Sequence, residues 1–202
     1  MVKAQTETTE PLYFWHWLKR NGDRVKKSLQ QGQMDVHEEI NRAFQQSYPE
    51  LVWEISPAAE GPWTFCISAE GTRTFFPFVE KAVAEAPTIP GWHIQAFRAR
   101  GSLDAEINMD NVTLSYHDIW CLMNPTPEGL SVCFHVRGLN SDNAEMLIEA
   151  TFILLDNAIG EYDAATRIHE IDFDVLPETV EESELYFPMH QLPAWLDRTQ
   201  TS

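Results

Sequence analysis

The sequence contains little that would build a disulfide framework, a metal site or a membrane span. Its three cysteines, Cys66, Cys121 and Cys133, are an odd and widely spaced number, and no Cys-x-x-Cys pair occurs among the 202 residues. This pattern predicts reduced, buried thiols. The longest apolar run, at residues 152–155, is far shorter than the roughly 20 residues that cross a bilayer. We therefore expect no membrane-spanning segment and no membrane partner.

The sequence also lacks the common motifs of nucleotide-binding, metal-binding and hydrolase sites. No Gly-x-Gly-x-x-Gly, Walker, His-Glu-x-x-His or Gly-x-Ser-x-Gly pattern occurs in the chain. The polar N-terminus, residues 1–7, lacks the apolar core of a secretion signal, which predicts a cytoplasmic protein. We accordingly expect no cofactor, and we favour a non-catalytic role over an enzyme.

Basic residues are scarce and unevenly placed. The chain has 14 Lys and Arg against 31 Asp and Glu, a net charge of −17. Residues 141–202 contain fourteen acids but only Arg167 and Arg198, whereas residues 1–30 are basic. So acidic a chain repels phosphate backbones, which argues against nucleic acid and favours a basic protein partner. The leading hypothesis is a protein-binding or regulatory module with an acidic surface; the alternative is that the acids only maintain solubility.

The chain begins with two predicted helices that form an N-terminal helical hairpin at residues 11–48, after a disordered leader at residues 1–10. Pro11 opens the first helix, and Asn21-Gly22-Asp23 is a candidate break within it. The second helix begins at Asp35 and ends before Pro49.

The remainder repeats the order strand, strand, helix, strand, first at residues 51–100 and again at 112–176. Hydrophobic alternation predicts the strands, among them residues 63–68, 112–120 and 168–175, and apolar residues at three- and four-residue steps predict the helices. We expect an α+β domain at residues 49–178, in which two ββαβ units form one mostly antiparallel sheet of about six strands with the helices on one face. This is a ferredoxin-like pseudo-repeat. The acidic and aromatic tail, residues 179–202, is expected to pack on the domain.

Several segments resemble a bacterial family of proteins of unknown function. The resemblance covers roughly residues 50–175 and rests on three segments: 67–71 (Ile-Ser-Ala-Glu-Gly), 76–80 (Phe-Pro-Phe-Val-Glu) with the following Ala-Pro-x-x-Pro-Gly-Trp of residues 86–92, and 154–163 (Leu-Leu-Asp-Asn-Ala-Ile-Gly-Glu-Tyr-Asp). It implies a small α+β domain and contributes no activity, because the family has no assigned chemistry.

A first candidate site follows the second long helix. Glu161, Tyr162 and Asp163 come directly after Gly160 and shortly before His169. Carboxylates at the negative end of a helix dipole need compensation by a cation or by hydrogen-bond donors. Glu161, Asp163 and His169 could therefore serve a hydrolase or a divalent-metal-dependent enzyme. The same residues are also consistent with a helix stop followed by a turn.

A second candidate site is the sheet face that carries no helix. If Val132, Phe134 and Val136 face the helices, the residues expected on the other face are Cys133, His135, Arg137, Thr113, Ser115, His117, Glu170, Asp172 and Asp174. Such a polar face could be solvated, bind a partner, bind a divalent ion such as zinc, or pair with a second copy. A self-associating structural module, a homodimer, is thus a further alternative.

Overall fold

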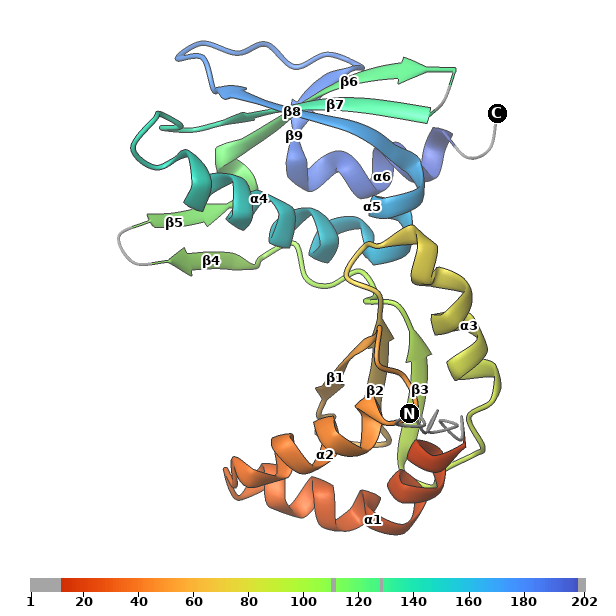
Figure 1. Ribbon diagram of the computed structural model, residues 1–202. Helices are drawn as coiled ribbons and strands as arrows, with labels where there is room; N and C mark the ends of the chain where they lie inside the picture. The colour runs from red at the N-terminus through yellow and green to blue at the C-terminus, as the bar shows by residue number, and fades with distance from the viewer. Residues whose placement is uncertain (1–11, 110–111, 128, 200–202) are drawn as a thin grey trace, which may run out of the picture. The chain divides into compact units, whose positions relative to one another are not determined.

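The computed structural model describes residues 12–109, 112–127 and 129–199, and the leader predicted at residues 1–10 lies outside them. The chain divides into two compact units, residues 1–97 and 98–202, of which the first has one described sheet and the second has two (Figure 1). The mixed α+β class is confirmed. None of the helices in the described ranges has the length and apolarity to cross a bilayer.

The first unit begins with the predicted pair of helices, α1 (Tyr13–Gln30) and α2 (Asp35–Gln45). Phe14, Trp15, Leu18 and Val25 recur at helical spacing and are fully buried. The break considered at Asn21-Gly22-Asp23 does not occur, since α1 continues through it. Gly22 is needed there for close packing, because a Cβ at this position would lie 2.5 Å from Nε1 of Trp92.

A three-stranded sheet completes the first unit. It consists of β1 (Val52–Ser56), β2 (Trp63–Ser68) and β3 (Trp92–Ala96), in that order. β1 pairs with β2 antiparallel, and β3 pairs with β2 in parallel after helix α3 (Phe76–Ala84), which follows the short 3₁₀ turn η1 (Arg73–Phe75). Phe65 of β2 is fully buried and contacts Phe14 and Phe44 of the two N-terminal helices.

Within its described residues, the second unit contains two sheets and three helices. A hairpin of β4 and β5 precedes a four-stranded sheet of order β8-β7-β6-β9. The strands are β4 (Glu106–Met109), β5 (Val112–Ser115), β6 (Ile119–Thr126), β7 (Gly129–Val136), β8 (Ile168–Val175) and β9 (Tyr186–Pro188). The helices are α4 (Ala144–Ile159), α5 (Glu161–Arg167) and α6 (Leu192–Thr199), with 3₁₀ turns η2 (Tyr116–Asp118) and η3 (Met189–Gln191).

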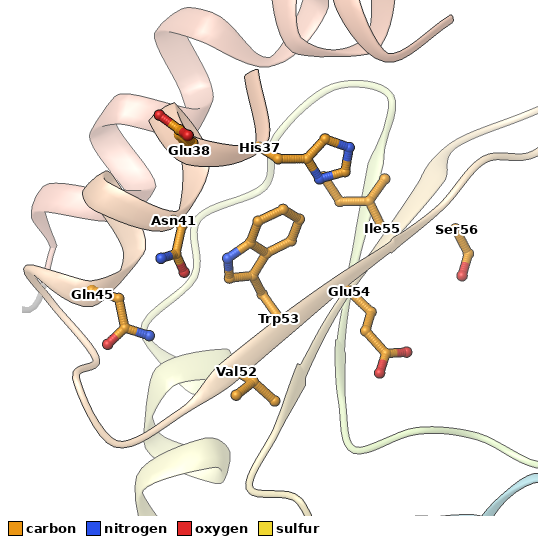
Figure 2. Close-up of a pocket in the computed structure, with 9 residues that line it drawn as sticks. All are labelled: His37, Glu38, Asn41, Gln45, Val52, Trp53, Glu54, Ile55 and Ser56. Atoms are coloured by element: carbon orange, nitrogen blue, oxygen red, sulfur yellow. The ribbon is translucent and has the colours of Figure 1, made fainter. Parts of the chain in front are cut away.

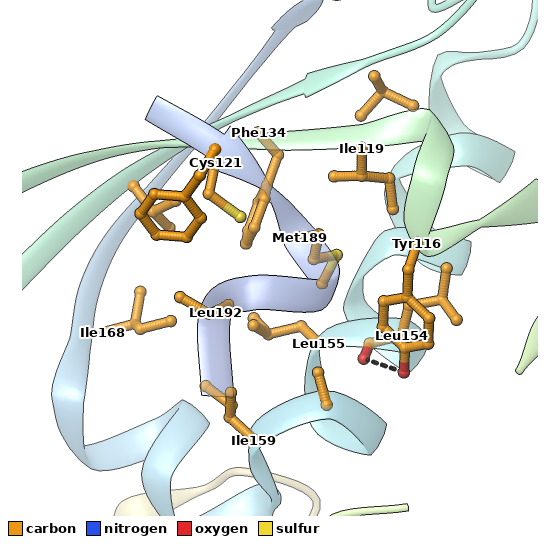
Figure 3. Close-up of a cluster of buried hydrophobic side chains, with 14 of the residues drawn as sticks. Tyr116, Ile119, Cys121, Phe134, Leu154, Leu155, Ile159, Ile168, Met189 and Leu192 are labelled. Atoms are coloured by element: carbon orange, nitrogen blue, oxygen red, sulfur yellow. Dashed lines mark hydrogen bonds between the residues drawn. The ribbon is translucent and has the colours of Figure 1, made fainter. Parts of the chain in front are cut away.

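The core of the second unit lies between the four-stranded sheet and helices α4 and α6, which Figure 1 shows on the same side of it. Phe134 of β7, Leu154 of α4 and Leu192 of α6 are fully buried in one cluster (Figure 3). The hydroxyl of Tyr116 donates to the carbonyl of Leu154 at 3.0 Å. The tail takes part in this core through Phe187, Met189 and Trp195.

The prediction of one continuous six-stranded sheet is wrong. Both ββαβ orders exist, as β1-β2-α3-β3 and β6-β7-α4-β8, but they lie in separate sheets, and each last strand is parallel to its neighbour. One physical reason is that the edge of β6 that could extend the sheet is already paired with β9, from the C-terminal tail. A second reason is that the turn η2 divides the strand predicted at residues 112–120 into β5 and β6.

Candidate functional site

The helix-free face of the four-stranded sheet carries the best-defined cluster of functional side chains. Strand alternation places Ile119, Cys121, Val132, Phe134 and Val136 toward the helices, and all five are fully buried. The burial of Cys121 raises the pKa of its thiol. The opposite face carries residues that are half-buried or exposed: Trp120, Leu122, Asn124, Ser131, Cys133, His135, Glu170, Asp172, Asp174 and Tyr186. The predicted outward positions of Cys133, His135 and Asp172 agree with this arrangement.

Three rings form an aromatic cluster on this face: Trp120, His135 and Tyr186. Trp120 lies directly opposite His135 in the β6–β7 register. The ring centroid of Tyr186 lies 5.1 Å from that of Trp120 and 5.1 Å from that of His135. The Tyr186 hydroxyl and Nδ1 of His135 are hydrogen bonded at 2.8 Å, so the three rings hold one another in place. Leu122, 42% exposed, extends the apolar surface beside them.

Carboxylates of the edge strand β8 border the aromatic cluster. The acidic rim consists of Glu170, Asp172 and Asp174. All three are exposed, and they lie opposite Ser131, Cys133 and His135. Burial raises the pKa of the Cys133 thiol, and the charges of Asp174 and Asp172 raise it further. Burial likewise raises the pKa of Tyr186, with smaller contributions from Cys133 and Asp174. The field on this face is therefore negative, and it disfavours thiolate and phenolate while favouring cations.

Arg137, predicted on the same face, does not neutralise the acidic rim. Its Nε lies 3.2 Å from Oδ1 of Asp118, and its backbone N–H donates to the carbonyl of Asp118 at 2.8 Å. The cation is therefore paired with the turn η2. None of the outward residues on β6 to β9, all within the described ranges, is a lysine or an arginine.

His117 does not join His135, and this part of the predicted face is wrong. The strand expected at residues 112–120 is interrupted by η2, where Ser115 and Asp118 form a reciprocal capping box. His117 lies in that turn, and its ring centroid is 5.2 Å from that of His190. The turn shifts the alternation, so that Trp120 and not His117 is the neighbour of His135.

The His117–His190 contact predicts a pH dependence of stability. Burial lowers the pKa of His190 below its ordinary 6.5, His117 lowers it further, and Glu182 opposes the shift. Because the unfolded chain takes up this proton at a higher pH than the folded protein, stability is fully present above about pH 6.5 and decreases as pH falls toward the folded pKa. We expect the urea midpoint to decrease more steeply from pH 7.5 to 5.5 in the wild type than in His190→Gln. If the urea midpoints of the two proteins decreased equally with pH, His190 would not contribute to the pH dependence of stability.

The residues of the first predicted site form a junction between α4 and α5. Gly160 ends α4 with φ +80° and ψ 150°, a conformation open mainly to glycine, and a Cβ there would lie 3.2 Å from the Arg98 carbonyl. Glu161, 0% exposed, accepts the N–H of Arg98 with Oε2 at 3.1 Å, while its own N–H donates to the Arg98 carbonyl at 3.0 Å. The junction thus begins with a reciprocal pair of hydrogen bonds.

Arg100 provides the cation that the acidic junction requires. Its Nε donates to the Ile159 carbonyl at the C-terminal end of α4 (3.2 Å), and its guanidinium bonds Asp163 at 2.8 Å and Asp197 at 3.0 Å. This charge compensates both the helix dipole and the carboxylates. The structure therefore gives Glu161 and Asp163 partners that hold residues 98–101 against the end of α4.

Tyr162 and His169, the other two residues of this predicted site, are exposed. Tyr162 is 46% exposed, with its carbonyl accepting the hydroxyl of Thr166 at 2.6 Å. His169 is exposed near the start of β8 and packs on Gly129, where a Cβ would lie 2.2 Å from its Cδ2. Across residues 12–109, 112–127 and 129–199, no group of three or more His, Cys, Asp or Glu side chains is arranged to hold a metal ion.

Sequence reasoning missed Trp120 and Tyr186. Trp120 could have been found from the hairpin, because pairing of Thr126 with Gly129 sets the register that brings position 120 opposite 135. Tyr186 belongs to a strand of three residues, too short for alternation to reveal.

Comparison with known proteins adds no relative to this description. No protein-family model matches the chain, and neither a curated protein nor a solved structure does.

Proposed function

We propose that this chain is a protein-binding module in which the helix-free face of the second unit recognises a positively charged segment of a partner protein. The observation that carries the proposal is the aromatic cluster bordered by the acidic rim, with no lysine or arginine among the outward residues of the four strands.

The arrangement has the physical features of an interaction surface. Tryptophan and tyrosine held rigidly by neighbours give large contact areas at low entropic cost, and they are enriched among residues that dominate binding energy. A lysine or arginine of the partner would meet the π-faces of Trp120 and Tyr186 and the carboxylates of Asp172 and Asp174. The acidic rim steers a basic partner and repels acidic ones, including a second copy of this chain.

The hydrolase alternative receives less support from the geometry. Its carboxylates, Glu161 and Asp163, are hydrogen bonded to Arg98 and Arg100, and Glu161 is fully buried. A general acid or base must reach the proton that it transfers. In the structure these groups instead form hydrogen bonds that hold residues 98–101 against the end of α4.

The proposal predicts how two changes on the face alter binding. Replacing Trp120 with alanine is expected to weaken capture of the partner by about 30-fold, or about 2 kcal/mol, since it removes the central anchor. Asp172→Asn/Asp174→Asn is expected to weaken it by about fivefold and to reduce its dependence on salt. The measurement is affinity capture from the native lysate at low salt, followed by titration with the captured protein.

The matched control is Glu145→Gln/Glu149→Gln, which makes the same change in net charge on the exposed side of α4. This variant should bind as the wild type does. The proposal fails if both charge variants bind equally, if Trp120→Ala binds normally, or if binding is independent of salt.

A further inference from the structure

The first unit contains a groove between helix α2 and the edge strand β1 that the proposed function does not use. The groove has a volume of about 680 Å³, and its walls are formed by His37, Glu38, Asn41 and Gln45 of α2 and by residues 52–56 of β1 (Figure 2). A second hollow of about 460 Å³ shares His37, Trp53 and Ile55 with it and continues past residues 57–59.

The floor of the groove is an aromatic ring that packing holds in place. Figure 2 shows the indole of Trp53 directed from β1 toward α2 and lying beside His37. Trp53 stacks on His37 at 6.0 Å between centroids and on Phe65 at 5.8 Å. It is half-buried, so one part of the ring contacts the core while another part lines the groove.

The hydrogen bonds of the sheet determine which main-chain groups border the groove. The N–H of Phe97 donates to the carbonyl of Ile67 at 2.8 Å, so Ile67 of β2 bonds toward β3. In an antiparallel pair the bonding direction alternates, and Cys66 therefore bonds toward its register partner Glu54 of β1.

It follows that Trp53 and Ile55, which flank Glu54, direct their N–H and C=O groups away from β2. β1 is the first strand of the order β1-β2-β3, and among the described residues no partner for these groups is present. The same two residues that line the groove thus present an unpaired strand edge to it.

The charges at the groove select the occupant. Glu38 and Glu54 are exposed carboxylates, and none of the residues that line the two hollows is a lysine or an arginine. Figure 2 shows Glu54 on the opposite side of β1 from Trp53. A strand added to β1 would place alternate side chains toward Trp53 and Ile55 on one face, and toward Glu54 on the other.

We propose that the groove binds an extended segment of a partner protein by strand addition to β1, with apolar side chains against Trp53 and Ile55 and a lysine or arginine against Glu54. Main-chain hydrogen bonds to Trp53 and Ile55 supply affinity, and the alternating pockets supply specificity. A second copy is a poor occupant, because antiparallel pairing centred on Glu54 would oppose two glutamates on chains of net charge −17. This site is independent of the aromatic cluster in the second unit.

The test uses the full chain and three synthetic peptides: one of alternating valine and lysine, one of alternating valine and glutamate, and the first with its valine amides N-methylated. Binding of the valine-lysine peptide is expected, with shifts of the Trp53 and Ile55 amide signals and slower hydrogen exchange at both. The N-methylated peptide should not bind, because it cannot pair with the strand edge. Equal binding of the N-methylated or glutamate peptide, or no binding at about 1 mM, would overturn the proposal.

Two variants distinguish binding in the groove from non-specific attraction to an acidic protein. Glu54→Gln should weaken binding of the valine-lysine peptide by about three- to fivefold, whereas Glu80→Gln, on the exposed side of α3, should leave it unchanged. Ile55→Pro removes one outward N–H and leaves the bonds between β1 and β2 in place, so it should abolish binding while the fold persists. If Asp172→Asn/Asp174→Asn weakens this binding as much as Glu54→Gln does, the peptide occupies the other unit and the proposal is wrong.

Discussion

Replacement of Glu161 with alanine is expected to lower the free energy of unfolding by about 3 kcal/mol. The carboxylate is fully buried and accepts the N–H of Arg98, so its removal takes the acceptor from a partly buried donor and opens a cavity. The loss should appear in urea denaturation as a decrease in the midpoint with an unchanged slope.

The size and sign of this effect distinguish a structural carboxylate from a catalytic one. Groups held for chemistry are commonly neutral or unfavourable for stability, so a catalytic Glu161 could be replaced with little loss or with a gain. The control is Glu170→Ala, which removes an exposed carboxylate of β8 and should change stability by about 0.5 kcal/mol or less. An alanine variant at position 161 as stable as the wild type would contradict the junction described here.

Replacement of Phe65 with alanine is expected to have the largest effect in the first unit, about 4 kcal/mol. The ring is 0% exposed and lies at the centre of an aromatic core. Its centroid is within 6.3 Å of five others, those of Phe14, Trp15, Phe44, Trp53 and Trp92. Truncation would leave a cavity that these large, mutually packed rings cannot close by small movements.

The matched substitution is Phe65→Leu, which keeps most of the buried volume. We expect it to cost about 1 kcal/mol, measured by tryptophan fluorescence during denaturation. If alanine and leucine at this position gave the same small loss, the description of Phe65 as the centre of the first core would be wrong.

The sequence predicted local structure well where one pattern repeated over several residues. Alternation placed β2 at residues 63–68 and β8 at 168–175, because one face of each strand packs on helices and the period of two is unambiguous. The helical pair at the N-terminus was predicted for the same reason, from an apolar stripe at helical spacing. The sequence suggested a helix break at Gly22. The glycine is instead needed for packing against Trp92, a residue too distant in sequence for local patterns to reveal the contact.

Sheet assembly could not be predicted, because it depends on contacts between distant segments. The separation of the two sheets involves pairing of β6 with Tyr186–Pro188, a segment with no strand pattern of its own. The candidate surface was predicted in part: strand parity identified His135 and Asp172, while the turn at Tyr116–Asp118 moved His117 away and brought Trp120 into its place.

We propose that the aromatic cluster and the acidic rim together form the surface for a basic partner. The most direct measurement is a two-dimensional NMR titration of the full chain with the partner that the wild type captures and Trp120→Ala does not. We expect shifts of the Trp120 indole N–H, of Tyr186 and His135, and of the amides of Asp172 and Asp174. Shifts confined to residues 178–184, or to the first unit, would contradict it.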